Sequence, residues 1–459
     1  MSQEKSTLKQ ELYAKRQKVY PRQVSGIFAS LRITAVLVLL GLYYGLPWIT
    51  WDGRQAILFD LPARQFHILG LTLWPQDFIY LAGLLIIAAL SLFFFTELAG
   101  RLWCGFACPQ TVWTEVFLWI ERSIEGERNK RIKLDKKGAM RKKIILKGFK
   151  HTVWILFSAW TGYTFVGYFT PIVELGGKLM SFSTGPWETF WVLFYGFATY
   201  ANAGWMREQV CIYMCPYARF QSAMFDSDTL IISYDPDRGE PRGARRRRDN
   251  PKELGLGECI DCQLCVQVCP TGIDIRNGLQ YQCIGCAACI DVCNDVMNKM
   301  SYPRGLIRYT TENMLKTGKT YLLRPRVFIY AIILLSCFSG LIYGLNTRSN
   351  VALDISRDRN VLYRELGNGD IENHYSFKIL NKDRKDHRYL VTVEGLDNVR
   401  LKFDDDTLLV TASNADTFQL RLIAIADSLL TSVTTVHFKL TALDDASISV
   451  TTDARFVGP

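Results

Sequence analysis

The segment Cys259–Pro270 reads C-I-D-C-Q-L-C-V-Q-V-C-P, and the segment Cys283–Asn294 repeats its spacing as C-I-G-C-A-A-C-I-D-V-C-N. Both place four cysteines with gaps of two, two and three residues, the spacing of bacterial two-cluster ferredoxins. Three thiolates two residues apart wrap a short loop around one face of a 4Fe–4S cubane, and the fourth reaches across to the other cluster. This rule predicts that cluster 1 takes Cys259, Cys262, Cys265 and Cys293, and that cluster 2 takes Cys269, Cys283, Cys286 and Cys289.

Zinc is the main alternative for clustered cysteines, but eight of them in this doubled spacing favour iron–sulfur clusters. The second segment departs from the ferredoxin pattern where Asn294 replaces a proline, and this removes no ligand. All-cysteine ligation and the nearby Asp261, Asp274 and Asp291 favour a low reduction potential. No cysteine lies beyond Cys337, and the tight grouping indicates metal ligation in a reducing compartment rather than a disulfide framework.

Working outward from these segments, the apolar residues gather in five blocks that predict membrane spans. Each block has roughly 19 residues, which as a helix reaches nearly 30 Å and crosses a hydrocarbon core. Tryptophan and tyrosine near several block ends are typical of an interfacial aromatic belt. No cleavable signal peptide is visible, so we expect the first block to be retained as an anchor. The blocks run from about Ile33 to Trp51, Phe78 to Phe95, Thr152 to Pro171, Trp187 to Trp205 and Val327 to Leu345.

The distribution of Lys and Arg predicts the orientation of these spans. The N-terminal arm, the segment Arg122–Lys150 and the insert with the run Arg245–Arg248 are rich in positive charge, whereas the loops after the first and third spans are poor. Five spans put all rich segments in the cytoplasm and export the region from Asn346 onward. The net charge of +10 therefore reflects topology, and we expect no nucleic-acid partner.

From Asn346 onward the sequence alternates polar and apolar or β-branched residues, with Asn, Asp and Gly between the segments. About seven short strands in such a length predict an immunoglobulin-like β-sandwich. The domain lacks the Cys–Trp–Cys core of antibody domains, and its pattern says little about function. The predicted strands are Tyr375–Leu380, Tyr389–Glu394, Val399–Phe403, Thr407–Thr411, Phe418–Ala424, Thr435–Leu440 and Ser447–Thr452.

The predicted fold is a multi-domain membrane protein. An α-helical transmembrane bundle of five spans carries a bacterial-type ferredoxin insert for two 4Fe–4S clusters and a C-terminal immunoglobulin-like β-sandwich. The predicted boundaries are a cytoplasmic N-terminal arm (1–32), a first hairpin of two spans (33–96), a cytoplasmic segment (97–151), a second hairpin (152–206), a cytoplasmic segment (207–326) with the ferredoxin domain at about 255–297, a fifth span (327–345) and a periplasmic domain (346–459).

A second cysteine pattern occurs twice. The sequence Cys104-Gly-Phe-Ala-Cys108-Pro109 follows the second span, and Cys211-Ile-Tyr-Met-Cys215-Pro216 follows the fourth, which indicates a parallel duplication. Cysteines four positions apart on a helix share one face, and the proline would end or kink that helix. If the two repeats face each other, four soft thiolates meet, which suits Cu(I), zinc or an iron–sulfur cluster. Buried structural cysteines are the alternative, as we expect for Cys337.

Other cofactor signatures are absent from the sequence. The five histidines form no C-x-x-C-H haem site and no spaced metal pair. There is no G-x-G-x-x-G loop, P-loop or nucleophile elbow. We therefore expect electrons to come from a partner protein or from the quinone pool.

This combination resembles the FixG/CcoG/RdxA family of cytochrome c oxidase accessory proteins, over nearly the whole chain. The segments Trp103–Gln110 and His374–Asn381 are similar to that family, and both C-x-x-x-C-P pairs with an exported sandwich are more specific than the ferredoxin spacing alone. The resemblance implies a role in maturing cbb3-type cytochrome c oxidase in the bacterial inner membrane, with reduction of Cu(II) to Cu(I) on the cytoplasmic side. It implies that the candidate copper or redox thiols are Cys104, Cys108, Cys211 and Cys215.

The resemblance leaves two other functions open. The chain can instead be a relay that passes electrons between quinol and a partner reductase, or a non-catalytic scaffold whose exported domain docks oxidase subunits. The expected partners are oxidase subunits or assembly factors, copper ions, membrane lipid and an unidentified electron donor, and a homo-oligomer is left open. The expected cofactors are two 4Fe–4S clusters, with copper as a further candidate.

Overall fold

The computed structural model describes residues 18–51, 53–251, 253–321, 324–358, 361–383, 385–396, 398–403, 408–411, 414–425 and 432–459. The chain forms two units, Met1–Phe338 and Ser339–Pro459. Residues 1–17 of the predicted N-terminal arm, which include four of its basic residues, lie outside the described residues.

Three helices in the described ranges are long and apolar enough to cross a membrane. The first joins α2 (Ile27–Gly45) to η1 (Leu46–Trp48), and the second joins η2 (Pro75–Asp77) to α3 (Phe78–Ala99). The third is α15 (Pro325–Asn346). They contain most of the first, second and fifth predicted spans, so the chain is a membrane protein. The first helix begins six residues earlier than predicted, at Ile27 rather than Ile33.

The third and fourth predicted spans fall on helices of a different character. The third lies mostly in α7 (Met140–Val166), which begins in a basic stretch and carries Ser, Thr and Tyr in its apolar half. The fourth lies on α9 (Pro186–Thr199), an α-helix of only 14 residues that continues as the π-helix η3 (Tyr200–Met206). The total of five spans therefore stays a prediction.

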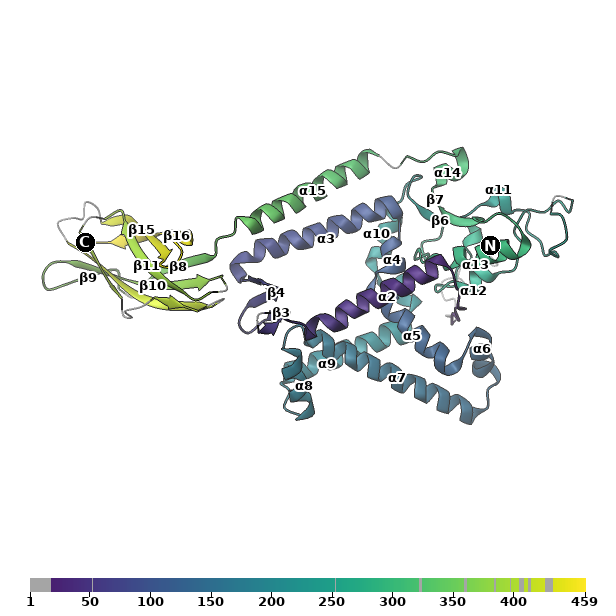
Figure 1. Cartoon of the computed structure of the whole chain (residues 1–459), viewed down its shortest axis with the longest axis horizontal. Helices are drawn as coiled ribbons and strands as arrows, with labels where there is room; N and C mark the ends of the chain where they lie inside the picture. The colour runs from purple at the N-terminus through teal and green to yellow at the C-terminus, as the bar shows by residue number, and fades with distance from the viewer. Residues whose placement is uncertain are drawn as a thin grey trace, which may run out of the picture. The chain divides into compact units, whose positions relative to one another are not determined.

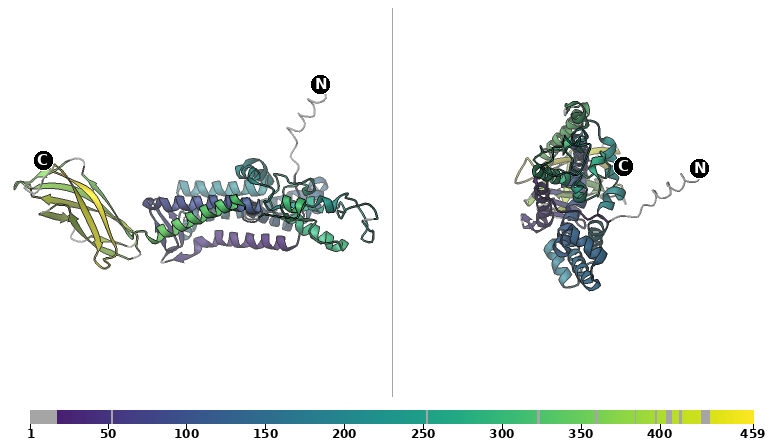
Figure 2. Two further views of the ribbon diagram at one scale, coloured as in Figure 1. Left: turned by 90° about the horizontal axis from the view of Figure 1, so that it is seen from above. Right: turned by 90° about the vertical axis from the view of Figure 1, so that its right-hand side faces the viewer.

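Between the first two candidate spans the chain forms short antiparallel strands, and beyond the second it forms the helices that carry the thiols. Figures 1 and 2 show the ferredoxin-like region at the end of the helices where α2 begins and α3 ends. The remaining elements of the first unit are β1 (Thr50–Trp51), β2 (Arg54–Gln55), β3 (Ile57–Asp60), β4 (Gln65–Ile68), β5 (Leu71–Leu73), α4 (Leu102–Phe106), α5 (Pro109–Glu125), α6 (Arg128–Lys137), α8 (Ile172–Met180), η4 (Val210–Met214), α10 (Pro216–Met224), β6 (Ile231–Tyr234), α11 (Pro236–Gly239), α12 (Leu264–Val268), η5 (Ile275–Asn277), α13 (Ala288–Met300), β7 (Ile307–Thr310) and α14 (Glu312–Thr317).

The ferredoxin-like region is built around its cysteines. Strands β6 and β7 pair antiparallel, and α12 and α13 pack against each other beside them. The buried core includes Ile232, Ile275, Ile290 and Met297 together with Cys259 and Cys265. This region is larger than the predicted range of about 255–297, because both strands that complete its core lie outside that range.

The second unit is the predicted β-sandwich. One sheet has the order β12-β14-β10-β8, with β9 paired to β10, and the other has the order β13-β11-β15-β16. Alternate residues of β10, among them Tyr375, Phe377 and Ile379, point into the core between the sheets, which is the period of two that the sequence predicts. All seven predicted strands are present, although Thr407 lies outside the described residues, and β8 and β9 were not predicted. The strands are β8 (Val351–Arg357), β9 (Arg364–Glu365), β10 (Ile371–Asn381), β11 (His387–Glu394), β12 (Val399–Phe403), β13 (Leu409–Val410), β14 (Ala415–Ala424), β15 (Val433–Ala442) and β16 (Ser449–Val457).

Candidate functional site

Two separate cavities lie among the eight ferredoxin cysteines. We call the first the cluster-1 cavity; it has about 380 Å³ of empty space, including the part that is open to solvent, and is bounded by the start of α12 and the middle of α13. Two of its cysteines are buried and Cys262 is exposed. The four cysteines predicted for cluster 1 all line this cavity: Cys259, Cys262, Cys265 and Cys293.

The second cavity, which we call the cluster-2 cavity, has about 350 Å³ of empty space, including the part that is open to solvent. The four cysteines predicted for cluster 2 all line it, and Cys265 also borders it. Ile232, Ile273 and Ile275 supply an apolar wall. The two cavities therefore adjoin through Cys265 and α12, which is the arrangement expected when each cysteine run sends its fourth ligand to the other cluster. The four cysteines are Cys269, Cys283, Cys286 and Cys289.

The backbone around both cavities repeats one unusual conformation. Asp261 (φ 50°) and Gly285 (φ 69°) occupy the left-handed region at equivalent positions of the two runs. Gln263 (φ 53°) and Ala287 (φ 58°) do so two residues later. When neighbouring residues alternate between right-handed and left-handed backbone conformations, their N–H groups point toward one centre. Such concave nests hold anionic groups, including iron–sulfur clusters. The cysteines and the backbone thus both fit 4Fe–4S clusters, while the assignment of individual ligands stays a prediction.

The ferredoxin thiols surround cavities and do not converge on the position of a single metal ion. In the described part of the chain, no three His, Cys, Asp or Glu side chains are grouped as a single metal ion requires. Burial raises the pKa of Cys283 and Cys293 to about 12, and that of Cys265 to about 11. Because ligands bind as thiolates, loading these sites with iron must release protons.

The acidic residues near the cysteines are compensated, contrary to the basis of the low-potential prediction. Arg276 forms ion pairs with Asp261 (2.5 Å) and Asp274 (2.7 Å). Asp291 accepts hydrogen bonds from the backbone N–H groups of Phe28 (3.3 Å) and Ala29 (2.7 Å), and so caps α2. The sequence alone does not reveal these partners. Arg276 reaches Asp261 only because the loop between them folds back, and Asp291 is more than 260 positions away from the start of α2.

The local structure of the paired thiols differs from the expected continuous helix. Cys104 lies in the short helix α4, but Cys108 has an extended backbone and precedes α5. Cys211 lies in the π-turn η4, and Cys215 likewise precedes α10. The helical turn that carries the first thiol of each pair ends before the proline, at Phe106 and at Met214, as expected. Each proline is also the first residue of a new helix, where its missing N–H costs nothing.

The two thiol pairs nevertheless come together. Cys104 and Cys211 both pack against a small buried core that includes Ile284 and Cys286 of the cluster-2 loop. The Cys104 thiol donates a hydrogen bond to Gln221 Oε1 (3.3 Å), a fully buried amide. Burial, together with the charges of neighbouring cysteines, raises the pKa of both Cys104 and Cys211 to about 12. Thiols from both repeats therefore meet beside the cluster-2 cavity.

Glycine permits this close packing. A Cβ on Gly105 would lie 2.6 Å from the carbonyl oxygen of Gly285 and 3.0 Å from Cys286 Cα. Helix α4, which carries Cys104, thus presses its backbone directly against the cluster-2 loop. No residue larger than glycine fits at position 105 without moving that loop.

Two arginines that the sequence analysis missed hold the same loop. Arg101, which is 6% exposed, donates hydrogen bonds to the carbonyl oxygens of Cys283 (3.1 Å), Tyr281 and Ala218. Arg32 donates to the carbonyl oxygen of Cys286. A signal was available, because Arg101 precedes Cys104 by three positions and Arg207 precedes Cys211 by four. Arg32 belongs to the N-terminal arm (1–32), whose positive charge was used for topology alone.

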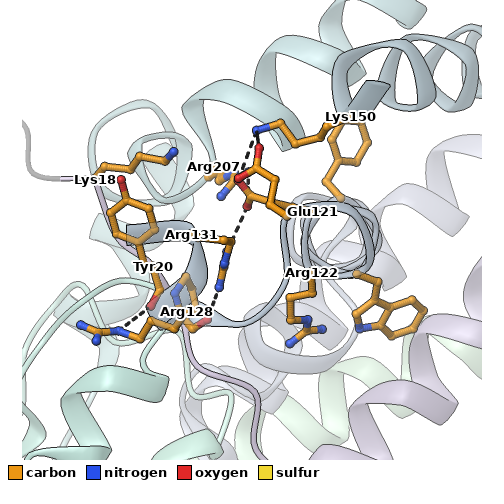
Figure 3. A network of polar contacts seen from close by, with 12 residues as sticks. Lys18, Tyr20, Glu121, Arg122, Arg128, Arg131, Lys150 and Arg207 are labelled. Carbon is orange, nitrogen blue, oxygen red and sulfur yellow. Dashed lines mark hydrogen bonds and ion pairs between the residues drawn. The ribbon is translucent and has the colours of Figure 1, made fainter. Parts of the chain in front are cut away.

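A buried ion network braces the elements around the thiols. Glu121 of α5 lies between Arg131 (3.2 Å), Lys150 (3.4 Å) and Arg207 (2.8 Å), as Figure 3 shows. Burial raises the pKa of Glu121, but the three cations outweigh it and lower the pKa to about 2. Arg131 and Lys150 belong to the basic segment that predicted topology, so part of that positive charge is structural.

The same network fastens residues 18–26, which we call the N-terminal strap. Arg131 also donates to the carbonyl oxygen of Pro21 (2.6 Å). Arg128 donates to that of Tyr20 (3.0 Å), as seen in Figure 3. The Tyr20 hydroxyl donates to Asp135 (2.6 Å). The strap continues onto the ferredoxin-like region, where the N–H of Arg22 donates to the carbonyl oxygen of Gln267.

Three family models match the chain. Residues 206–312 match a 4Fe-4S dicluster domain, and residues 341–459 match the model described as an IG-like fold at the C-terminal of FixG. Residues 81–126 match a 4Fe-4S binding domain, and this range contains the first thiol pair. Iron–sulfur binding and the immunoglobulin-like domain are thereby established.

Several proteins are similar to this chain over most of its length. Protein RdxA of Cereibacter sphaeroides is 41% identical over 86% of this chain and 86% of its own length. Protein RdxB of the same organism is 40% identical over 90% of both chains. The nitrogen fixation protein FixG of Rhizobium meliloti is 37% identical over 84% of this chain and 80% of its own length.

Proposed function

This chain belongs to the FixG/RdxA family of iron–sulfur electron-transfer proteins, and from that premise we propose that it reduces Cu(II) to Cu(I) for the assembly of a cbb3-type cytochrome c oxidase. The paired thiols receive the copper, which is the substrate. The clusters, when bound, supply one electron each. The reaction is a one-electron transfer to each Cu(II) ion. Retention of Cu(I) by the thiols breaks their S–H bonds and releases the protons to solvent.

One observation carries this proposal. Cys104 and Cys211 pack against the buried core that contains Cys286, a predicted ligand of cluster 2. Cu(I) is a soft ion that prefers thiolates, so thiols beside an electron source can retain the ion that reduction creates. The hydrogen bond from Cys104 to Gln221 orients one thiol. The contact of Gly105 with the cluster-2 loop keeps helix α4, which carries Cys104, close to that loop.

The test uses anaerobically purified full-length protein that is reduced with dithionite and freed of excess reductant. We expect the double variant Cys104→Ala/Cys211→Ala to produce Cu(I) at least tenfold more slowly than the wild type, as measured with a Cu(I)-specific chelator. Cys337→Ala is the matched control, because this cysteine lies in α15, outside the site. An unchanged rate in the double variant, at about eight irons per chain, would refute the role of the thiols.

A relay function is the second candidate, and the family model on residues 81–126 favours it. That model is described as a 4Fe-4S binding domain although the range holds only Cys104 and Cys108. In this case the four paired thiols ligate a third cluster and pass electrons to a partner. Iron analysis separates the candidates, since a third cluster raises the content from about eight to about twelve irons per chain.

We further propose five membrane spans, with the N-terminus and the ferredoxin-like region in the cytoplasm of a bacterium and the sandwich in the periplasm. The packing of α7 on α9 supports the two less apolar spans. A Cβ on Gly162 would lie 2.2 Å from the carbonyl oxygen of Val192, and Gly196 lies opposite Ser158. Small residues that let backbones approach closely are typical of helix pairs in membranes. Reporter fusions after residues 181 and 346 test this topology; both ends must be periplasmic.

A further inference from the structure

A third cavity, outside both cluster cavities, lies beside the cluster-2 loop. Its cavity volume is about 110 Å³, and it continues into a wider space that is open to solvent. Ala29, Arg32 and Ile33 contribute the first two turns of α2 to its lining. Because α2 is long and apolar enough to cross a membrane, the cavity lies at one end of a candidate span.

The N-terminal strap forms one wall of this cavity. Val19, Pro21 and Val24 line it, and they belong to the segment that Arg128 and Arg131 fasten in Figure 3. The Glu121 network therefore has a second role besides bracing helices: it holds a wall in place.

The opposite wall is one face of α5. Thr114, Glu115, Leu118, Trp119 and Arg122 recur at the spacing of a single helical face, and all line the cavity. Glu115 Oε1 accepts hydrogen bonds from Trp119 Nε1 (2.9 Å) and Arg122 Nη2 (3.3 Å). Its other oxygen has no hydrogen-bond partner within the described residues and can accept a proton. The face thus offers an aromatic surface, a cationic donor and a carboxylate.

The cavity touches both redox groups of the proposed function. Cys286, a predicted ligand of cluster 2, and Cys211, one of the paired thiols, line it. Four arginines and two glutamates make its charged lining predominantly positive, which opposes entry of a bare copper ion. The remaining lining, including Val268, Pro270 and Ile284, is apolar. This chemistry suits an uncharged ring with polar oxygens and an apolar body.

We propose that this cavity binds a membrane quinol as the electron donor, an inference that rests on the proposed function. Both quinol O–H bonds break, and the ring becomes the quinone. The two protons leave in turn through the carboxylate of Glu115 to solvent. Cys286 would hold cluster 2 beside the cavity, and the two clusters, when bound, would take up one electron each. The sequence has no phosphate-binding glycine loop of the kind that nicotinamide cofactors use.

The first experiment measures binding without turnover. Full-length protein is irradiated with a short-tailed azido-benzoquinone, and labelled peptides are mapped by mass spectrometry. We expect labelling of residues 18–26 and 111–122 that excess unlabelled benzoquinone prevents. Thr114→Phe, which fills the cavity from α5, must reduce the label at least tenfold. Ser123→Phe is the matched control, because Ser123 is exposed on the same helix and does not line the cavity.

The second experiment measures reduction of the clusters by a short-tailed quinol, with dithionite in parallel. We expect Thr114→Phe and Glu115→Gln to slow reduction by quinol at least tenfold and to leave reduction by dithionite unchanged. Glu115→Gln must still bind the azidoquinone, since it loses only the proton acceptor. Labelling elsewhere, labelling that unlabelled quinone does not prevent, or equal quinol rates in the wild type and Thr114→Phe would overturn the inference.

The two proposals fail in different ways. If protein reduced by dithionite does not reduce Cu(II), the proposed function is refuted. The labelling result is independent of copper and still reports whether the cavity binds quinone. If that protein reduces Cu(II) but quinol neither binds nor reduces it, the quinol site falls and the cupric reductase remains. A soluble thiol or flavin that prevents labelling where quinone does not would assign the cavity to that donor and contradict the quinol.

Discussion

The cluster-1 and cluster-2 cavities share one backbone geometry but have different surroundings. At the cluster-1 cavity Cys262 is exposed, and the nearby Arg276 is compensated by Asp261 and Asp274. At the cluster-2 cavity Arg32 and Arg101 donate to loop carbonyl groups, and within the described residues neither forms an ion pair with a carboxylate. Uncompensated positive charge lowers the energy of an added electron. The comparison teaches that electrons should collect at cluster 2, beside the thiols.

Enclosure also differs between the cavities. The cluster-2 loop is contacted by α4 through Gly105 and adjoins Val24 of the N-terminal strap. The start of α2 is tied to α13 by Asp291. Damage to these contacts should therefore affect cluster 2 and leave cluster 1 in place. The following predictions test this asymmetry.

The largest effect is expected from Glu121→Gln. The change leaves Arg131 and Arg207 buried without their carboxylate, whereas Lys150 keeps its ion pair with Glu125 (2.7 Å). Loss of one partner of a buried ion pair costs about 3–5 kcal/mol. We expect the free energy of unfolding of the full chain in detergent to fall by about 3 kcal/mol, with cluster 2 lost first. Chemical denaturation followed by far-UV circular dichroism and EPR measures both. Loss of both clusters together would contradict the expectation that cluster 2 is the more sensitive of the two.

The pH dependence gives Glu121 a distinct signature. Its pKa is lowered to about 2, so its contribution is complete above the unfolded pKa of about 4.3 and is lost as the pH falls toward 2. We expect the difference in stability between the wild type and Glu121→Gln to be constant above about pH 5 and to shrink below pH 4. A constant difference down to pH 2 would show that the carboxylate acts without its charge.

The next effect is expected from Gly105→Ala. The added Cβ meets the Gly285 carbonyl oxygen at 2.6 Å, and overpacking of this kind costs about 1–3 kcal/mol. We expect α4 to move from the cluster-2 loop, so the cupric reductase rate falls while cluster 1 keeps its EPR signal. Gly148→Ala is the control, because a Cβ there meets nothing within 4 Å. Equal rates in the two variants would refute direct contact between thiol helix and cluster loop.

A smaller effect is expected from Arg101→Gln. Removing one buried charge near cluster 2 should lower the midpoint potential of that cluster alone, by about 60 mV, which is roughly tenfold in the equilibrium constant of a one-electron couple. Redox titration monitored by EPR measures the shift. Lys299→Gln is the control, since Lys299 lies exposed on α13. A shift of both clusters by the same amount would remove the asymmetry.

The smallest effect is expected from Asp291→Ala. The change removes the carboxylate that caps α2, and loss of a cap costs about 1 kcal/mol. We expect a slightly lower unfolding midpoint and easier proteolysis of the strap. Asp295→Ala, on the same helix, removes only an exposed ion pair with Lys299 and should change the midpoint less. Equal midpoints for both variants would show that α2 does not depend on α13.

Much of the fold followed from short-range patterns. Alternation along β10 predicted the strand that carries Tyr375 and Phe377, and continuous apolar runs predicted three candidate spans. Predictions fell short where tertiary contacts decide. Cys104 and Cys108 do not share one continuous helix, since α4 ends at Phe106 and α5 begins at Pro109, and α9 changes into a π-helix after Thr199. Neither event leaves a periodic signal in the sequence.

The sequence by itself determined which cysteines gather, because ligand spacing along one short loop is a local property that few conformations satisfy. Cavities lined by Cys259 with Cys293, and by Cys269 with Cys283, repeat that spacing in space, although the identity of the ligands remains a prediction. The tertiary structure alone decided what surrounds each cavity. Arg32 reaches Cys286 across 254 positions and Arg101 reaches Cys283 across 182, and contacts between such distant segments depend on how helices pack, which no local pattern encodes.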